Sequence, residues 1–453
     1  MRRAAVRSLA MTATPDAQPE PAGSEPVGRE DCEDAYLEGD RTFEPGTARA
    51  AWSHRTFRTV YLGAFASNIG TWMQNVVLGA LAYSLTRSGV FVGLIIAAQL
   101  GPLLIFSPVG GVIADSFDRK RSLIILCIQQ AVFSLLLALV TLPAEPNQTA
   151  MLLVVLVIGI GNALYAPIFS AVVPILVPRQ DLSGAISLNS VQMNASRVIG
   201  PAIGATIYSN WGPSWVFVLN AASFGFVIVS LLRVTLPAPV ATGTQGLHRL
   251  LEGFEVARRD RVVRQCLVVI FVFSLLCLPF ITQMPTIADT NLGIASKSTA
   301  YGILYACFGL GAVIGALSIG TVFAGSSKPK LTRVGLLGFA GMILVFGTMH
   351  TALPAYFAIM ALGCVYFAVI TSLSTVLQQD LDDRVRGKVM ALWIMGFGGT
   401  VPFGGLAGGW VIEQVGITPM IGFSALIAVA LAWRADLLPT RPSGVLALEP
   451  ASA

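Results

Sequence analysis

The sequence predicts an all-α membrane protein of twelve transmembrane helices arranged as two six-helix bundles. Its residues are 55% hydrophobic and only 12% charged, and its mean hydropathy of +0.73 is too high for an ordinary soluble domain. A helix needs roughly 20 apolar residues to cross the hydrocarbon core, and the chain contains twelve stretches of about that length. One long polar connection divides them into six and six.

The predicted spans are continuous runs of Leu, Val, Ile, Ala, Phe and Gly. Membrane barrels instead alternate apolar and polar residues, so these runs predict helices, which satisfy their own backbone groups in lipid. The 45 glycines and 25 prolines predict kinks and close helix contacts, since both residues are common in membrane helices. The spans cover residues 57–85, 90–114, 122–142, 150–176, 185–208, 214–236, 265–288, 299–323, 332–350, 354–378, 388–412 and 417–438.

Basic side chains gather in every second connection, whereas the other connections hold only Arg87 and Lys297. By the positive-inside rule this asymmetry predicts a multi-pass protein of the cell (inner) membrane with both termini cytoplasmic. It also accounts for the net charge of +5 without a nucleic-acid partner. The basic residues concerned are Arg119, Lys120, Arg121, Arg179, Arg249, Arg258, Arg259, Arg261, Arg264, Lys328, Lys330, Arg333, Arg384, Arg386 and Lys388.

The polar segments define the domain boundaries. The first 50 residues are rich in Pro, Ala, Gly and acidic residues without apolar periodicity, which is typical of disorder. The stretch Leu250–Val256 has the spacing of an amphipathic helix lying on the membrane surface. We therefore expect a disordered cytoplasmic tail (1–54), a first bundle (55–236), a cytoplasmic central loop (237–264), a second bundle (265–438) and a cytoplasmic C-terminal tail (439–453).

The two halves repeat a glycine pattern in spans five and eleven. Leu188 and Leu392 fall in the same register as the glycines. Parallel six-span repeats are how one large class of transporters is built. The matching pairs, each separated by 204 residues, are Gly200 and Gly404, Gly204 and Gly408, and Gly212 and Gly416.

The turn Gly111-Val-Ile-Ala-Asp115-Ser-Phe-Asp118-Arg119-Lys120-Arg121 joins two apolar spans. With six plus six spans and a basic central loop, this motif resembles the major facilitator superfamily. The resemblance implies a conformational latch for the outward-open state, and the alternative is a charge cluster that only sets topology. Asp118 replaces the usual glycine, and the second copy, Gly320 to Lys330, has Ala324 in place of the acid, so we expect a one-sided latch. The latch residues are Gly111, Asp115, Arg119, Lys120 and Arg121.

Two further stretches are similar to the branch of this superfamily that includes enterobactin exporters and related secretion proteins. They are Ser67-Asn-Ile-Gly70-Thr-Trp72-Met73-Gln74 and the pattern from Leu188 to Gly204. Gly200-Pro201-x-x-Gly204 also resembles a shortened antiporter motif, with Ala205 where a second glycine is usual. The resemblance implies close helix packing at Gly200, Pro201 and Gly204, and transport outward.

Polar residues within the spans are candidates for a substrate cavity. Asn68, Thr71 and Asn75 share one helical face and either line a cavity or bond neighbouring helices. Arg197 lies deep in its span, where an arginine costs at least about 2.5–3.5 kcal/mol. It either binds an anionic or catecholate-like substrate or ties helices together. The full candidate set is Asn68, Thr71, Asn75, Gln99, Asn162, Tyr165, Gln192, Arg197, Gln283, Tyr366 and Trp393.

The sequence therefore predicts a secondary active transporter that exports an amphipathic small molecule, such as a siderophore, drug or metabolite. No Walker loop is present, so we expect a proton gradient to drive antiport, although Asp289 and Glu413 lie only at outer helix ends. Scattered histidines and the lack of a CxxC pair predict no metal or other cofactor, and no catalytic cluster predicts an enzyme. The alternatives are an importer on the same fold and a non-transporting membrane sensor or scaffold.

Overall fold

The computed structural model describes residues 43–236, 254–379, 381 and 383–435, without the side chains of Asp115, Asp383 and Arg384. The chain divides into a unit Met1–Pro45 and a unit Gly46–Ala453, and every helix named below belongs to the second unit. The C-terminal tail and most of the expected amphipathic helix in the central loop lie outside the described residues.

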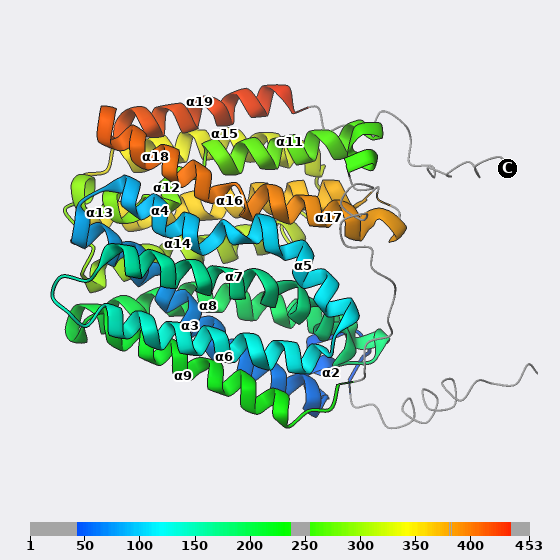
Figure 1. The fold of residues 1–453 in the computed structure, drawn as a ribbon. Coiled ribbons are helices and arrows are strands. Elements are labelled where there is room, and N and C mark those ends of the chain that lie inside the picture. The colour runs from blue at the N-terminus through cyan, green and yellow to red at the C-terminus, as the bar shows by residue number, and fades with distance from the viewer. Residues whose placement is uncertain (1–42, 237–253, 380, 382, 436–453) are drawn as a thin grey trace, which may run out of the picture. The chain divides into compact units, whose positions relative to one another are not determined.

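The first half contains six membrane-length helical segments (Figure 1). The second segment is divided at Gly101, where Pro102 starts a new helix. Helix α3 packs against α8 and α9, and α6 packs against α7 and α9. The segments are α3 (Arg55–Thr86), α4 (Gly89–Leu100) with α5 (Pro102–Ser116), α6 (Arg119–Val140), α7 (Gln148–Val172), α8 (Leu182–Trp211) and α9 (Pro213–Leu232).

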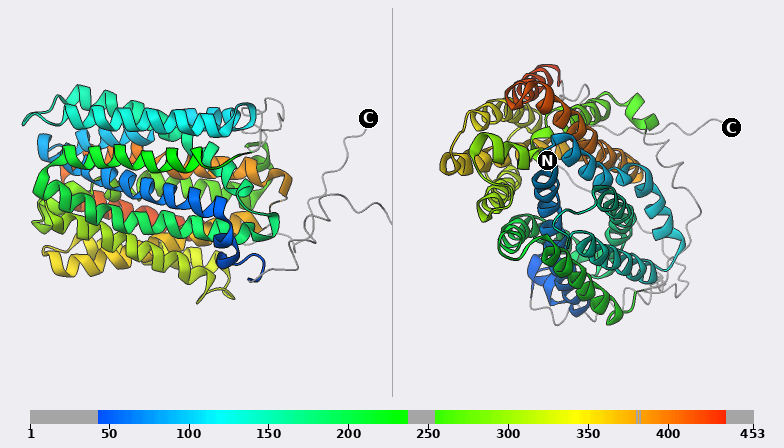
Figure 2. Two further views of the ribbon diagram at one scale, coloured as in Figure 1. Left: turned by 90° about the horizontal axis from the view of Figure 1, so that it is seen from below. Right: turned by 60° about the vertical axis from the view of Figure 1, so that its left-hand side comes forward.

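The second half repeats this arrangement, with further breaks next to prolines. Helix α16 packs against α14 and α15, and α15 packs against α19. Figure 2 shows the helices of both halves running roughly parallel to one another. The segments are α11 (Arg261–Leu276) with α12 (Pro279–Thr282) and α13 (Met284–Leu292), α14 (Thr299–Gly320), α15 (Lys328–Gly347), α16 (Ala352–Gln379), α17 (Asp383–Gly398) with α18 (Val401–Val415), and α19 (Ile417–Arg434).

Ten segments of the described chain are long and apolar enough to cross a membrane. The two predicted spans that fall outside this set are α3 and α8, whose lengths of 32 and 30 residues suffice for a crossing. They carry the polar side chains of Asn68, Asn75, Gln192 and Arg197, which lower their average hydropathy. Since α3 and α8 pack on each other and on neighbouring spans, the prediction of an all-α fold of two six-helix bundles is confirmed.

The folded region begins earlier than the tail boundary expected at residue 54. Residues Ala48–Ser53 form helix α2, in which Ala51 is completely buried. His54 Nε2 lies 2.8 Å from Asp181 Oδ2, which ties this helix to the connection between α7 and α8. Six residues are too few for hydropathy to reveal, so only the tertiary contacts define α2.

The described part of the central connection, from residue 254 onward, contains helical structure. Residues 254–259 are helical, and α11 begins at Arg261 with the Asp260 side chain as its N-cap, four residues before the expected start of the span. Arg261 and Arg264 in its first turn reduce the local hydropathy, so the apolar pattern alone places the start of the span too late.

The glycine repeat has a structural counterpart at the ends of α8 and α18. Gly212 and Gly416 have φ angles of +90° and +93°, in the region that favours glycine, and each ends one helix and starts the next. A Cβ atom on Gly204 would lie 2.9 Å from Met73 Cα of α3, whereas one on Gly408 would lie 2.6 Å from Pro279 Cβ of α12. The two halves thus use equivalent glycines for equivalent helix contacts.

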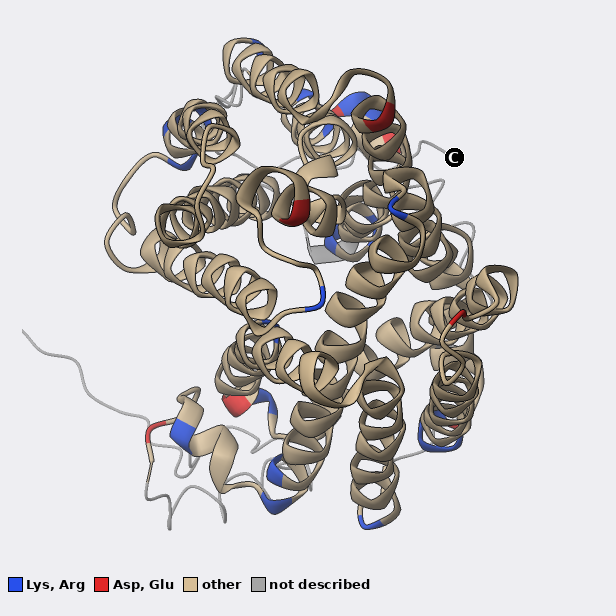
Figure 3. Ribbon diagram, turned by 90° about the vertical axis from the view of Figure 1, so that its left-hand side faces the viewer, with Lys and Arg blue, Asp and Glu red and all other residues tan. Residues whose placement is uncertain are grey.

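The ends of the helices differ in charge. We call the end that holds the turns at residues 117–119, 173–181 and 321–327 the basic end, because it carries most of the basic residues expected in the cytoplasmic connections. The opposite end holds Arg87, Asp289, Lys297 and Glu413. Figure 3 looks onto this opposite end, where charged positions are sparse.

Candidate functional site

Arg197 of α8 lies between aromatic rings from both halves of the chain. Its guanidinium carbon is 5.0 Å from the ring centroid of Trp72 in α3 and 4.7 Å from that of Phe367 in α16. A cation over an aromatic face is attracted by the ring quadrupole. Arg197 therefore connects the first bundle to the second through its side chain, at the depth where α8 packs against α14.

Several hydrogen-bond donors around Arg197 lack partners in the described structure. Its Nη1 reaches Asn194 Oδ1 at only 3.5 Å, and its Nε has no acceptor. Gln192 Nε2 and Ser196 Oγ, on the same helix, are also buried without partners. Each unsatisfied buried donor costs about 1–3 kcal/mol, so this part of α8 offers donors to a ligand that carries several acceptor atoms.

The polar face of α3 divides into two parts. Asn75 Oδ1 accepts a hydrogen bond from Gln99 Nε2 of α4, so these two candidates bond neighbouring helices, and Gln99 is buried. Asn68 and Thr71 are half-buried. On this face of α3, Asn75 therefore bonds a neighbouring helix, whereas Asn68 and Thr71 remain partly exposed.

Three other candidates lie on α7 and α17. Asn162 and Tyr165 are half-buried on α7, where the Tyr165 ring stacks on Phe169 at 5.5 Å. Trp393 of α17 is only 5% exposed. These positions share a polar or aromatic character within spans.

Gln283 and Tyr366 are both buried and contact several neighbouring helices. Gln283 is completely buried, and its Nε2 donates to the carbonyl oxygens of Gly89 and Gly405 at 2.9 Å each. Because these carbonyls belong to α4 and α18, Gln283 ties the two bundles together. Tyr366 is 4% exposed, and its ring stacks on Phe273 and Phe308. The same ring meets Phe367 edge to face at 4.8 Å, which places Tyr366 beside the aromatic ring that Arg197 contacts.

Three residues of the site were not among the candidates predicted from the sequence: Trp72 and Phe367, which contact Arg197, and the buried amide Gln74. Gln74 of α3 is 2% exposed and accepts hydrogen bonds from Asn220 Nδ2 at 2.9 Å and Ser134 Oγ at 3.1 Å. Trp72 and Gln74 both belong to the stretch that resembles secretion proteins, which was the available signal. Nothing in the sequence singles out Phe367 among the 24 phenylalanines.

Ionic and polar contacts connect the two bundles at the opposite end. Arg87 forms an ion pair with Asp289, and Glu413 Oε1 accepts from Ser88 Oγ at 2.6 Å. Glu413 Oε1 also accepts from the backbone N–H of Val90 at 3.0 Å. We call Arg87, Ser88, Gln283, Asp289 and Glu413 the end clamp, because every member bonds across the seam between the bundles.

Glycines bring the backbones together beside the end clamp. A Cβ atom on Gly89 would lie 3.2 Å from Gly409 Cα, and one on Gly93 would lie 2.8 Å from Leu406 Cα. Helices α4 and α18 therefore pack closely along their length. Toward the basic end, beyond the break at Gly101, α5 diverges from α17 and contacts it at few positions (Figure 1).

The motif at residues 111–121 makes its described contacts within the first bundle. Asp118 Oδ1 accepts the N–H of Arg121 at 2.9 Å and so caps α6, which gives the unusual residue a structural role. Arg119 Nε donates to Ala114 O at 2.8 Å, and Lys120 Nζ to Val234 O at 2.7 Å. Gly111 has open space beside it. The prediction for the Asp115 carboxylate lies outside the described side chains.

In the second copy of this motif a lysine occupies the turn. Lys328 Nζ donates to the carbonyl oxygens of Ile319 at 3.1 Å, Phe323 at 2.6 Å and Ala324 at 3.0 Å. It thus satisfies carbonyls at the C-terminal end of α14, where a cation is favourable. In this turn Ala324 stands where the first copy has an acid, and the buried Lys328 caps the C-terminal end of α14.

Gly200 of the export motif packs directly on α3. A Cβ atom there would lie 2.6 Å from Trp72 Cβ, and the equivalent atom on Gly204 would meet Met73. Pro201 is buried in the same helix. Small residues at these positions allow α8 to approach α3 closely enough for Arg197 to reach over Trp72.

Comparison with known proteins identifies the family to which this chain is similar. Residues 46–446 match the sequence profile of the transmembrane secretion effector family. The chain is 29% identical over 349 residues to the enterobactin exporter EntS of Shigella boydii serotype 4 (strain Sb227), covering 75% of this chain and 81% of the relative. The enterobactin exporter of Escherichia coli O81 (strain ED1a) has the same identity and coverage.

Solved transporter structures share the fold at low sequence identity. A D-xylose–proton symporter superposes with a TM-score of 0.69 at 14% identity, covering 84% of this chain and 98% of that one. The nucleoside transporter NupG gives a TM-score of 0.66 at 16% identity with the same coverage. These proteins are transporters and not enzymes. The chain therefore belongs to the transmembrane secretion effector family of the major facilitator superfamily and is a multi-pass membrane transporter.

Proposed function

We propose that this transporter exports an amphipathic small molecule from the cytoplasm by alternating access around Arg197. In this proposal the basic end is cytoplasmic, as the positive-inside rule favours, both termini are cytoplasmic, and the protein lies in the cell (inner) membrane. The end clamp then closes the outer side of the seam while α5 and α17 diverge on the cytoplasmic side. A substrate approaches Arg197 from the cytoplasm in this state.

The contact that carries the proposal is Arg197 between Trp72 and Phe367. Two aromatic rings and a guanidinium suit a flat, acceptor-rich group, since aromatic faces stack and Arg donates in a planar fork. The unmatched donors of Gln192 and Ser196 add to this preference. A catecholate-like siderophore has this chemistry, and the relatives named as enterobactin exporters support the same class of substrate.

Two motif roles form part of the same proposal. Gly111, Asp115, Arg119, Lys120 and Arg121 act as the latch when the cytoplasmic ends of the bundles close. Gly200, Pro201 and Gly204 hold α8 against α3, so that Arg197 keeps its position when the bundles move. A proton gradient drives the exchange.

The test is efflux of a labelled catecholate siderophore from cells that lack their own exporter, with and without a protonophore. We expect Arg197→Ala to reduce efflux about ten- to hundredfold, because a hydrogen bond to a charged group contributes about 1.5–3 kcal/mol. Arg197→Lys keeps the charge but not the planar fork, and should fall between Arg197→Ala and the wild type.

The matched control is Arg55→Ala, which removes an exposed arginine at the start of α3. Normal efflux in both Arg197 variants, with protein levels equal to the control, would remove Arg197 from the binding site. Saturable uptake into vesicles whose interior corresponds to the cytoplasm would favour an importer. Deletion of residues 1–42 tests the scaffold alternative, since a transporter should tolerate it and a scaffold should not.

A further inference from the structure

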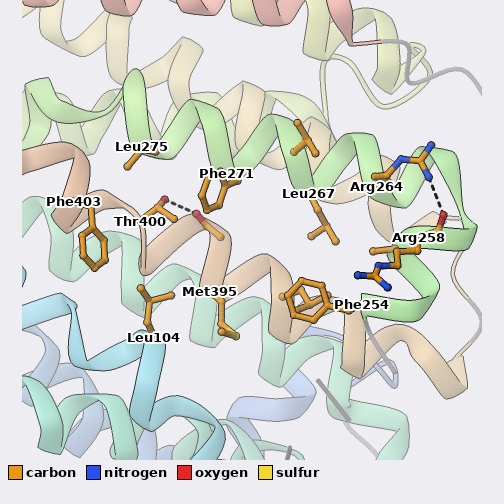
Figure 4. Close-up of a pocket in the computed structure, with 14 residues that line it drawn as sticks. Leu104, Phe254, Arg258, Arg264, Leu267, Phe271, Leu275, Met395, Thr400 and Phe403 are labelled. Atoms are coloured by element: carbon orange, nitrogen blue, oxygen red, sulfur yellow. Dashed lines mark hydrogen bonds between the residues drawn. The ribbon is translucent and has the colours of Figure 1, made fainter. Parts of the chain in front are cut away.

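A groove on the side of the second bundle reaches the seam between the bundles near the basic end (Figure 4). Its volume is about 650 Å³. Its walls come from the short helix at residues 254–259, from α11, from α17 and α18, and, across the seam, from Leu104 of α5. None of the eleven cavity candidates named from the sequence lines it, so it is distinct from the site around Arg197.

The walls of the groove are apolar and face outward. Val268 is 53% exposed, Phe271 47% and Phe403 53%. All three lie in membrane-spanning segments, where an outward-facing side chain meets lipid. The exposed apolar surface therefore suits a hydrocarbon chain that belongs to the bilayer.

Two arginines stand at one end of the groove. Figure 4 shows Arg258 and Arg264 together, with Phe271, Leu275 and Phe403 further along. Arg264 Nη1 donates to the backbone carbonyl of Arg258 at 2.8 Å, which fixes its direction, and both side chains are exposed.

The carboxylates of Glu255 and Asp260, which are close in sequence to the two arginines, bind other groups. Glu255 pairs with Arg259 at 2.5 Å, and Asp260 caps α11 by accepting the N–H of Val263 at 2.9 Å. Within the described residues, neither Arg258 nor Arg264 has a carboxylate partner. The mouth of the groove thus carries positive charge that an anion could balance.

The length of the groove fits one leaflet of a bilayer. Leu275 follows Arg264 by eleven residues on α11, which corresponds to roughly 16 Å at a rise of about 1.5 Å per residue. Half of a hydrocarbon core is about 15 Å thick. An occupant with its charge at the arginines and its chain along Phe271 and Leu275 therefore spans a single leaflet.

We propose that this groove binds an anionic phospholipid, with its phosphate at Arg258 and Arg264 and one acyl chain along α11 beside Leu104. On the proposed orientation, the lipid belongs to the cytoplasmic leaflet. Because the groove contains residues of both α5 and α17, the bound chain lies where these helices diverge. Binding should favour the state in which the cytoplasmic side of the seam is open.

The first experiment titrates the delipidated full-length protein with phosphatidylglycerol or phosphatidylcholine and counts bound lipids by native mass spectrometry. We expect phosphatidylglycerol to bind preferentially, and the double variant Arg258→Gln, Arg264→Gln to weaken this binding by about tenfold, because basic residues attract anionic lipid. Arg259→Gln is the matched control, since Arg259 lies on the same short helix outside the groove lining. Equal binding of both lipids, or unchanged binding by the double variant, would overturn the proposal.

The second experiment locates the acyl chain with a phosphatidylglycerol that carries a photoreactive diazirine. Crosslinks should form in the stretch from Arg264 to Leu275 and not on the exposed face of α15 around Val334. Crosslinks spread evenly over both helices would indicate only general lipid contact. Protection of the groove by the transport substrate, or by residues 237–253 of the chain, would identify a different occupant and contradict the proposal.

The lipid measurements are independent of the proposed export activity. The Arg197→Ala variant should bind phosphatidylglycerol as the wild type does, because Arg197 is not part of the groove lining. Lipid binding without siderophore efflux would leave the groove proposal intact and remove the export proposal, whereas efflux without selective lipid binding would do the reverse.

Discussion

The two halves of the seam between the bundles are built from different chemistry. Toward the opposite end, α4 and α18 approach closely at glycines, and the end clamp adds hydrogen bonds such as those from Gln283 to Gly89 and Gly405. Toward the basic end, α5 and α17 diverge, and the side chains of Leu103 and Leu104 lie beside Gly398 and Gly399 across the seam.

At the opposite end, the seam closes through specific hydrogen bonds and close backbone contacts. At the basic end, the seam has apolar contacts, so opening it there breaks none of the end-clamp bonds. Breaks at Gly101 and between Gly398 and Val401 divide both seam helices at similar places. On the proposed alternating-access cycle, these breaks are where each helix would pivot while its outer segment keeps its packing. The comparison predicts that substitutions in α4 or in the end clamp shift the conformational equilibrium more than equivalent changes within one bundle.

The largest effect is expected from Gly93→Leu. A Cβ atom there would lie 2.8 Å from Leu406 Cα and 3.0 Å from Gly405 O, and backbone atoms cannot move aside as a flexible side chain can. Overpacking of about 3 kcal/mol should prevent closure of the outer seam and abolish efflux. Gly225→Leu is the control, because its Cβ would meet nothing within 4 Å. Wild-type efflux by Gly93→Leu would show that the close packing is not required.

Gln283→Leu should have an intermediate effect. It leaves the carbonyls of Gly89 and Gly405 without their donor in the closed state, at a cost of about 2 kcal/mol. We expect an approximately 30-fold shift toward an open outer seam, measured by double electron–electron resonance between spin labels at Leu142→Cys and Leu353→Cys.

Both label sites are exposed, at 66% and 69%, and lie at the opposite end on different bundles. Gln129→Leu provides the comparison, since Gln129 donates to Val157 O within the first bundle. An equal change of the distance distribution in both variants would mean that the loss of any buried amide has this effect.

The smallest effect is expected from Asp289→Asn. The Arg87 side chain is 64% exposed, and an exposed ion pair contributes about 0–1 kcal/mol. The outer distance distribution should therefore change less than in Gln283→Leu, and added salt should reduce even this difference. A larger shift than that of Gln283→Leu would make the ion pair the principal bond of the end clamp.

Most of the fold could be predicted because lipid imposes long apolar helices, and the 204-residue glycine repeat marked equivalent turns. The site could be predicted less well. Arg197 stood out because a charge within a span is rare, but Gln283 and Asn68 look alike in sequence and differ in structure, since Gln283 is completely buried and Asn68 is half-buried. Whether an amide faces a cavity or a neighbouring carbonyl depends on helix rotation, which is set by packing between distant segments.

Helix α2 has a practical consequence for work with shortened proteins. Asp181 is 1% exposed. Its Oδ1 accepts a hydrogen bond from the backbone N–H of Gly46, and its Oδ2 lies 2.8 Å from His54 Nε2. A truncation that starts at Arg55 would remove the contacts of Gly46 and His54 with this buried carboxylate and would lower the stability of the fold. A purification tag or fluorescent reporter should therefore be joined upstream of Gly46, with this segment kept whole.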